Sequence, residues 1–277
     1  MFKILFILLM LYSNAFAQLP KVSIITSLFN ATFFIDSFLQ NIVKQTIFNQ
    51  CELIIINANS PGAEDTIIKP YLAQYPNIIY LKLDNDPGLY GVWNMGIKMA
   101  KADYIINANV DDGLKEDALE IFANSLDLNQ DIDMVYSDVY MTTQPNTSFD
   151  KLKKKGVTKL KPFSKESMIM CPPLNHPMWR KSIHTRFGFF DESYKSASDF
   201  EMWLRAVEKG SLFVKLEGVY GFFYINVKGL SHSKTHALEV KKILFQYRNV
   251  FNLEALTADK IMFEYYKAAA ESFIWYK

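Results

Sequence analysis

Apolar, strand-like segments alternate with amphipathic, helix-like segments along the first half of the chain, and this alternation restricts the fold more than any other feature. The segment "KVSIITSLF" is apolar on both faces, as a strand in the middle of a parallel sheet must be. The segment "FIDSFLQNIVKQT" after it repeats apolar residues at the spacing of one helix face. Strands that alternate with helices form β-α-β units with right-handed crossovers. The pattern predicts an α/β fold with a Rossmann-like, mostly parallel sheet flanked by helices.

The same patterns locate the individual elements. The predicted strands are 21–29, 51–60, 77–83, 103–109 and 133–141. The predicted helices are 34–46, 67–75 with an interruption at Pro70, 91–102, 114–129, 198–210, 237–251 and 257–276. In the helix 198–210 we expect Ser198 as the N-cap, Glu201 as the other half of a capping box, and Gly210 as the end.

Composition excludes several classes of function. Half of the 277 residues are apolar, enough for one large domain or for two halves that share a core. Lys and Arg number 30 and Asp and Glu 29, so no overall charge favours nucleic acid as a partner. The two cysteines, Cys51 and Cys171, form no CxxC pair. Neither a zinc site nor a disulfide framework is indicated, and their positions give no reason to expect the one bond open to them.

The N-terminus has the layout of a secretory signal peptide, predicted as residues 1–17. Lys3 precedes an apolar run over 4–11, and Ala15-Phe16-Ala17 stands before Gln18. The apolar run is too short to cross a bilayer as an ordinary helix. The alternatives are an uncleaved interfacial anchor, or a start misassigned upstream of the first strand. A signal or anchor predicts an exported or membrane-associated protein, and a misassigned start predicts a cytoplasmic one.

Polar side chains follow each of the first four predicted strands. Ligands on such sheets bind beyond the carboxyl ends of the strands, where these groups converge. The sequence contains no GxGxxG after the first strand and no GxxxxGK[ST], so a dinucleotide site and a P-loop are disfavoured. The adjacent carboxylates fit either an Asx turn or a cation site that presents a phosphorylated ligand. The polar residues at the strand ends are Asn30, Asn57, Asn59, Ser60, Asp84, Asp86, Asn109, Asp111 and Asp112.

Two further segments allow more than one interpretation. The basic stretch "KLKKKGVTKLK" over 151–161 fits a solvated loop, a mobile lid, or a contact for an anionic acceptor or lipid head group. The helices predicted near the C-terminus carry apolar stripes of the kind that usually packs in a core. The aromatic end "FIWYK" leaves room for contact with a partner or a membrane surface.

Five segments together resemble a family 2 glycosyltransferase of the GT-A fold, over about residues 21–235. They are "VSIITSLFN", "ELIIINANS", "DNDPGLYGVWNMGIKMAKADYI", "NVDD" and "GFFDESYKSASDFEMWLR", in that order. The resemblance implies a nucleotide-sugar donor, a divalent metal (Mn²⁺ or Mg²⁺) and usually inversion at the anomeric carbon. It divides the chain into a nucleotide-sugar half (21–112), an acceptor half (113–235) and a C-terminal helical extension (236–277).

The resemblance assigns donor-side roles by position. Residues 109–112 look like the family's metal-binding DxD segment, with Asp111 as the metal ligand and Asn109 as a weaker one. Asp112 is directed either toward the donor sugar or toward the groups that surround the metal ligands. Asn109 stands where the family often has an aspartate, and Asn57 and Asn59 replace acidic residues, so the nucleotide base is not implied. His232 is a weaker candidate near the metal or the diphosphate. The residues implied in donor binding are Asn30, Asn57, Asn59, Asp86, Asn94 and Asp112.

On the acceptor side, Asp199 falls at the position of the family's general base. A carboxylate there would take the proton of the acceptor hydroxyl as that hydroxyl attacks the sugar. The alternative is that Asp199 only stabilises the N-terminus of its helix. His176, Trp203 and Arg205 are the other residues placed on this side. The implied mechanism is one displacement without a covalent enzyme intermediate.

The implied function is sugar transfer to a glycan, lipid-linked or protein acceptor in polysaccharide or glycoconjugate synthesis. The asparagines at two strand ends also fit a catalytically silent module that binds sugar nucleotides or glycans. A nucleotidyltransferase on a related sheet would also use aspartates, but the Gly-rich phosphate loop expected near its first strand is absent.

Overall fold

The computed structural model describes residues 19–170, 173, 175–226 and 229–276. The predicted signal peptide (1–17) and Cys171 lie outside the described residues. Among the described residues, no helix combines the length and the apolar character needed to cross a membrane.

Ten strands of the described chain join in one mixed sheet. The strands are β1 (Val22–Leu28), β2 (Cys51–Asn57), β3 (Ile78–Lys82), β4 (Tyr104–Asn107), β5 (Gly113–Leu114), β6 (Met134–Thr142), β7 (Gly156–Thr158), β8 (Met178–Arg180), β9 (Phe213–Tyr224) and β10 (Phe273–Trp275). The order across the sheet is β10-β7-β6-β8-β4-β1-β2-β3, and β9 pairs with β6 and β5.

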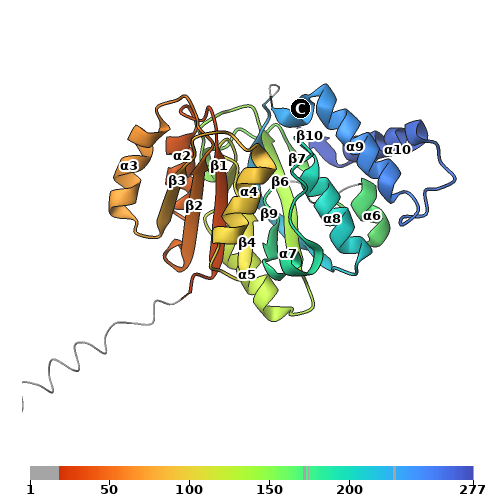
Figure 1. Cartoon of the computed structure of the whole chain (residues 1–277), viewed down its shortest axis with the longest axis horizontal. Helices are drawn as coiled ribbons and strands as arrows, with labels where there is room; N and C mark the ends of the chain where they lie inside the picture. Colours follow the sequence, from red (N-terminus) through yellow and green to blue (C-terminus); the bar gives the residue numbers. More distant parts are fainter. Residues whose placement is uncertain (1–18, 171–172, 174, 227–228, 277) are drawn as a thin grey trace, which may run out of the picture.

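Helices lie along the sheet and at its ends (Figure 1). They are α2 (Ile35–Ile42), α3 (Glu64–Gln74), α4 (Leu89–Met99), α5 (Ala118–Leu128), α6 (Lys165–Met170), α7 (Ser182–Phe187), α8 (Ser198–Glu208), α9 (Lys234–Tyr247) and α10 (Ala258–Glu271). In Figure 1, α3 stands at one end of the molecule and the pair α9 and α10 at the other.

The first four strands form the predicted parallel sheet, in the order β4-β1-β2-β3. Every residue of β2 is buried, which explains why "CELIIIN" carries almost no polar side chain. Alternate residues feed two separate cores: Leu53 and Ile55 pack with α2 and α5, while Ile54 and Ile56 pack with α4 and α8. The predicted mostly parallel α/β fold is confirmed in this half.

The second half extends the sheet with antiparallel pairs. β8 runs antiparallel to β4, and β6 runs antiparallel to β8, so β6 points in the same direction as β4. The end of β6 therefore lies at the edge of the sheet where β1, β2 and β4 also end. We call this edge the carboxyl edge.

Two element predictions in this half are wrong. The helix predicted to reach residue 276 ends at Glu271 and is followed by β10, which pairs with β7. Because β7 covers only residues 156–158 of the basic stretch 151–161, the solvated-loop interpretation fails for those three residues, and a lid or an anionic contact stays a prediction. The helix α8 begins after Ala197, and Ser198 makes no capping bond. Glu201 instead binds Arg205 and Tyr247. Gly210, with a φ of +92°, ends the helix as predicted.

In the first half, the helix predicted to be interrupted at Pro70 is continuous. It begins at Glu64 and runs through Pro70 to Gln74. Pro70 removes one backbone donor, and the remaining turns hold the helix together.

Candidate active site

The segment from β4 to β5 places Asp111 and Asp112 at the carboxyl edge in a tight turn. The N–H of Asp112 donates to the carbonyl of Asn109 at 3.3 Å. Gly113 opens β5 directly against β9, where a Cβ atom would lie 2.5 Å from the ring of Phe222. The glycine of the "DDG" sequence is therefore required for the close approach of β9 to this turn.

Asp112 is buried and ties three segments together. Its carboxylate accepts hydrogen bonds from the backbone N–H of Tyr224 at 2.9 Å, the amide of Asn175 at 2.8 Å and the amide of Asn109 at 3.1 Å. Burial raises the pKa of Asp112, and these three donors oppose the rise. With three donors already bound, Asp112 holds the loop in place.

Asp111, its neighbour, is half-buried and less fully bound. Burial and the adjacent Asp112 carboxylate raise the pKa of Asp111 to about 6, while a hydrogen bond with the Asn226 side chain opposes the rise. Asp111 borders a small cavity that is also lined by Asn146, Thr147 and Phe222. A bound cation would stabilise the charged form of this carboxylate, because it would offset the repulsion between Asp111 and Asp112.

His176, predicted on the acceptor side, lies close to Asp111. It is 4% exposed, and its backbone φ of +61° is unusual for a histidine. Burial lowers its pKa to about 4, so the imidazole is neutral at neutral pH. Its ring packs closely on position 221, where a Cβ atom would lie 3.0 Å from Cδ2. His176 thus forms part of the wall behind Asp111.

The donor set at this turn fits a hard divalent cation that is shared with a phosphorylated ligand. Among the described residues, no three His, Cys, Asp or Glu side chains are arranged to hold a metal alone. Mg²⁺ commonly binds through one or two carboxylates plus substrate phosphates and water, which suits a site with Asp111 as its main protein ligand. Asn109 turns its amide nitrogen toward Asp112.

The loops after β1 and β2 are fastened to each other at the same edge. Asn30 and Asn59 both have positive φ, which asparagine tolerates better than most residues, and both are exposed. Ser60 Oγ accepts from the N–H of Asn30 at 3.0 Å and donates to Glu64 at 2.8 Å. Glu64, fully buried, also accepts from the N–H of Ala31 at 2.8 Å. This network fixes the two exposed asparagine loops beside each other.

Three other predicted donor residues are already bonded within the protein. Asn57 accepts from the N–H of Ser60 at 2.7 Å and donates to the hydroxyl of Tyr80 at 2.8 Å. Asp86 is exposed and accepts from the N–H of Gly88 at 2.8 Å. Asn94 is buried in α4 and bonds both backbone groups of Phe190, as well as Glu192. Their part in donor binding stays a prediction.

Asp199 is the second residue of α8 and faces α4. Its carboxylate accepts a hydrogen bond of 2.9 Å from the hydroxyl of Tyr90, which is itself 2% exposed. Burial raises the pKa of Asp199, while the Tyr90 hydroxyl and the nearby His236 of α9 favour its charged form. A carboxylate with a raised pKa is a better proton acceptor than an exposed one. Because α4 begins just after β3, this pair also lies toward the carboxyl edge.

The other predicted acceptor-side residues lie inside the structure. Trp203 is 2% exposed and packs against Trp179, with a ring separation of 5.2 Å. Arg205 pairs with Glu201 at 2.7 Å and bonds the carbonyl of Phe189. On the donor side, His232, the weaker candidate near the metal or the diphosphate, ends the short helix η3 (Leu230–His232), and its side chain lies outside what the structure describes.

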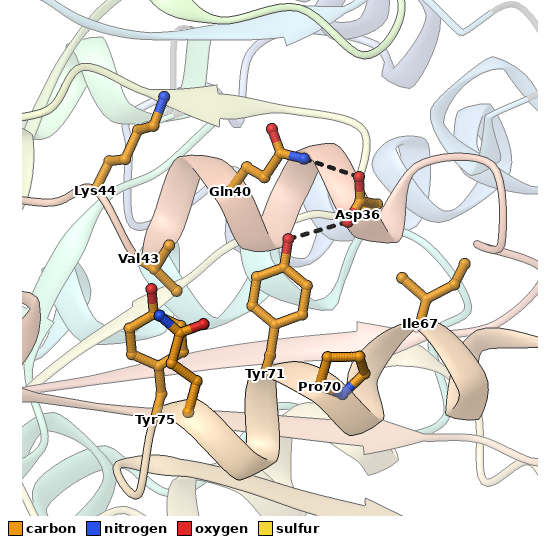
Figure 2. Close-up of a pocket in the computed structure, with 9 residues that line it drawn as sticks. Asp36, Gln40, Val43, Lys44, Ile67, Pro70, Tyr71 and Tyr75 are labelled. Carbon is orange, nitrogen blue, oxygen red and sulfur yellow. Dashed lines mark hydrogen bonds between the residues drawn. The ribbon is translucent and has the colours of Figure 1, made fainter.

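A groove in the described chain lies away from these residues, between α2 and α3 (Figure 2). It measures about 740 Å³, and its lining contains no predicted site residue. As Figure 2 shows, Tyr71 and Gln40 both point at Asp36, with hydrogen bonds of 3.0 and 2.8 Å. These three polar side chains therefore satisfy each other, and the candidate site remains at the carboxyl edge.

The sequence patterns did not identify Tyr90, Asn175 or Glu64. Asn175 adjoins the predicted His176, and that adjacency is the only signal in the sequence that could have pointed to it. Tyr90 stands 109 positions from Asp199, and Glu64 contacts a loop 33 positions away. Only the fold brings these partners together.

Comparisons with known proteins identify the family of this chain. The family model described as "Glycosyl transferase family 2" matches residues 23–192, more than half of the chain. The chain is similar to the minor teichoic acid biosynthesis protein GgaB of Bacillus subtilis, with 32% identity over 121 residues. That match covers 43% of this chain but only 13% of GgaB.

Solved structures share the fold at low sequence identity. Residues 1–349 of S. aureus TarS in complex with UDP-GlcNAc superpose with a TM-score of 0.67 at 15% identity, covering 91% of this chain and 73% of that one. The mannosyltransferase PcManGT of Pyrobaculum calidifontis, in complex with GDP-Man and Mn²⁺, gives 0.66 at 13% identity, covering 92% and 75%. These likenesses establish the GT-A fold. The family model that matches residues 23–192 shows that the chain belongs to glycosyl transferase family 2.

Proposed function

We propose that this protein is a nucleotide-sugar-dependent glycosyltransferase that moves a sugar from a nucleotide diphosphate to an acceptor hydroxyl with inversion. The observation that carries the proposal is the pairing of two carboxylate positions at one edge of the sheet. One, Asp111 with Asp112, is suited to a cation and a diphosphate; the other, Asp199, is suited to accept a proton. Family membership and the nucleotide-sugar complexes of the structural neighbours support it.

In this mechanism the donor diphosphate lies against the turn 109–112. Mn²⁺ or Mg²⁺ bound there would act as a Lewis acid and neutralise the leaving diphosphate. Asp112 holds the turn rigid through its bonds to Tyr224, Asn175 and Asn109. The exposed loops at Asn30 and Asn59, fixed by Ser60 and Glu64, lie at the carboxyl edge, where the nucleoside would be bound.

Asp199 would act on the acceptor. Its carboxylate takes the proton from the acceptor hydroxyl while that oxygen forms the new bond to the anomeric carbon and the nucleotide diphosphate leaves. Tyr90 holds the carboxylate in one orientation. Attack on the face opposite to the leaving group inverts the configuration. The bond made and the bond broken balance without a covalent enzyme intermediate.

A screen of sugar nucleotides with the full chain tests the proposal. We expect release of UDP or GDP from one donor in the presence of Mn²⁺ or Mg²⁺, with loss of release when the metal is chelated. Binding of a sugar nucleotide without turnover, in the presence of a panel of glycan, lipid-linked and protein acceptors, would instead support a silent binding module. The amides at Asn57 and Asn59, where the family often has acidic residues, are the observation that favours that second candidate.

A further inference from the structure

A cluster of exposed lysines lies beside an exposed aromatic strand, although the two segments are far apart in the sequence. Lys151, Lys153, Lys154 and Lys155 are all exposed. The register of β7 and β10 places Trp275 opposite Gly156, and the N–H of Tyr276 donates to the carbonyl of Lys155 at 2.8 Å. Figure 1 shows the C-terminus beside β7 and β10. We call these four lysines together with Trp275 and Tyr276 the basic–aromatic edge.

The lysines of this surface carry positive charge that the protein does not neutralise. In the described part of the chain, no salt bridge joins any of the four to a carboxylate. Lys154 lies 3.9 Å above the ring of Tyr140, which leaves its charge intact. Asp150, exposed like the lysines, is the acidic residue next to them in sequence. An anionic partner would therefore meet a net positive surface.

The neighbouring side chains are apolar or amphipathic and point to solvent. Trp275 is 60% exposed and Tyr276 is 46% exposed. Ile274, which directly precedes them in the sequence, is 41% exposed. The strand β10 is the outermost strand of the sheet on this side. Tryptophan and tyrosine next to lysines form the combination that sits at the boundary between lipid head groups and acyl chains.

The position of the surface also matters, because it shares the carboxyl edge with the candidate active site. Gly156 pairs with Met141 near the end of β6, and β6 points in the same direction as β4. The loop between β6 and the lysines reaches Asp111: Asn146 and Thr147 line the cavity that Asp111 borders. A surface bound here would face the same side as the site.

We propose that the basic–aromatic edge docks this protein on the surface of an anionic phospholipid bilayer. The lysines bind the phosphate-bearing head groups, and Trp275 and Tyr276 enter the interfacial layer. A free phosphate or a soluble polyanion would engage the lysines but would leave the two aromatic rings in water, so the exposed rings favour a bilayer. The proposal is independent of the sugar-transfer reaction, and its test measures binding alone.

The test is sedimentation of the full chain with vesicles of phosphatidylcholine, alone or mixed with phosphatidylglycerol. We expect binding to the anionic vesicles that weakens as salt is raised. Replacement of the four lysines by glutamine should lower partition on the order of 100-fold, because each lysine near an anionic surface contributes several-fold. Trp275→Ser should lower it by roughly tenfold through lost apolar contact.

Matched variants separate the effect of this surface from the effects of overall charge and of exposed apolar side chains elsewhere. Lys44, Lys69, Lys98 and Lys101 are exposed lysines on other parts of the chain, and changing them to glutamine removes the same charge. Leu128→Ser removes an apolar side chain that is 83% exposed elsewhere. Both controls should bind vesicles as the wild type does.

Three results would overturn the proposal: anionic-vesicle binding by the four-lysine variant within twofold of wild type, an equal loss in the control lysine variant, or full displacement from vesicles by inorganic polyphosphate with no effect of Trp275→Ser. The last result would assign the lysines to a soluble polyanion. Melting temperatures close to wild type show that each variant is folded, and the single variants Lys153→Gln and Lys154→Gln serve if the fourfold variant is not.

Discussion

The two carboxylate positions of the candidate site, after β4 and at the start of α8, are held in different ways. After β4, two neighbouring aspartates share one turn. Asp112 is bound by three neutral N–H donors, and burial together with the Asp112 carboxylate raises the pKa of Asp111 to about 6. At α8, the single carboxylate of Asp199 accepts a hydrogen bond from the hydroxyl of Tyr90. Burial raises the pKa at both positions.

The difference indicates two kinds of chemistry. A pair of adjacent carboxylates that are costly to ionise together gains from a cation, which relieves the repulsion. A lone carboxylate with a raised pKa and one phenolic donor gains nothing comparable from a metal, but it is well suited to take up and release a proton. The variants below test whether the two positions can be separated experimentally.

The largest effect is expected for Asp199→Asn. Asparagine keeps the size of the side chain and does not serve as a general base, so transfer should fall by roughly 10²–10⁴-fold. Donor affinity and melting temperature should change little, because the donor groups lie at the strand ends and asparagine is well tolerated at a helix start. Turnover, nucleotide affinity and melting temperature are measured on one preparation.

The matched control is Asp191→Asn, an exposed carboxylate in the loop before α8. It should transfer sugar at nearly the wild-type rate. If Asp199→Asn stays within a few-fold of wild type, Asp199 is not the base, and a modest loss of stability with normal turnover would leave it only a role at the helix start.

Asp111→Asn should act on the donor and leave the base untouched. Loss of the charged ligand should weaken nucleotide binding in Mn²⁺ by about 100-fold, by analogy with the loss of groups that support metal sites. Stability at neutral pH should not fall, since the change also removes the repulsion with Asp112. Titration with UDP and GDP, with and without Mn²⁺, measures the effect, and an unchanged dependence on Mn²⁺ would remove Asp111 from the metal site.

Asp112→Asn should lower the stability of the protein, whereas Asp111→Asn should weaken nucleotide binding without lowering stability. The two variants therefore form a direct comparison. The carboxylate accepts three N–H donors, and an amide would turn a donor of its own toward at least one of them. We expect a loss of about 1–3 kcal/mol in the free energy of unfolding. Denaturant titration of the two variants side by side checks this; equal stability would mean that Asp112 does not hold the loop.

The first half of the fold could be predicted from local sequence patterns. The four parallel strands, the helices between them and the turn with Asp111 and Asp112 follow from local patterns, because each strand is apolar on both faces and each helix carries its own apolar face. The mostly parallel sheet was predicted correctly on this basis, and the family was predicted correctly from the resemblance of five sequence segments.

The second half depends on contacts that no local pattern records. Residues 156–158 and 273–275 form strands because they pair with each other, although the first lies in a lysine-rich stretch and the second at the end of an expected helix. Likewise, Ser198 looks like an N-cap in sequence, but Glu201 is drawn to Arg205 and Tyr247 instead of closing a capping box. Tertiary partners overrode local preference at these positions.

The smallest effect is expected for Tyr90→Phe, as a shift in the pH dependence of the transfer rate. This variant acts on Asp199 and leaves Asp111 and Asp112 unchanged. The Tyr90 hydroxyl stabilises the charged form of Asp199, so its removal should raise the pKa of Asp199 further. Because the base must be ionised to act, the acidic limb of the rate profile should move to higher pH, and the rate above that limb should fall only a few-fold.

The groups that face Asp199 from other elements are Tyr90 of α4 and His236 of α9, so the shift can be assigned to the lost hydroxyl. Phenylalanine keeps the aromatic packing on Trp93 and Phe190. Tyr247→Phe is the matched control, because it removes a buried hydroxyl that donates to Glu201 of the same helix at 2.7 Å. Both variants should lose about 1 kcal/mol of stability, but only Tyr90→Phe should move the acidic limb. If both profiles move equally, or neither moves while Asp199→Asn is inactive, Tyr90 does not tune the base.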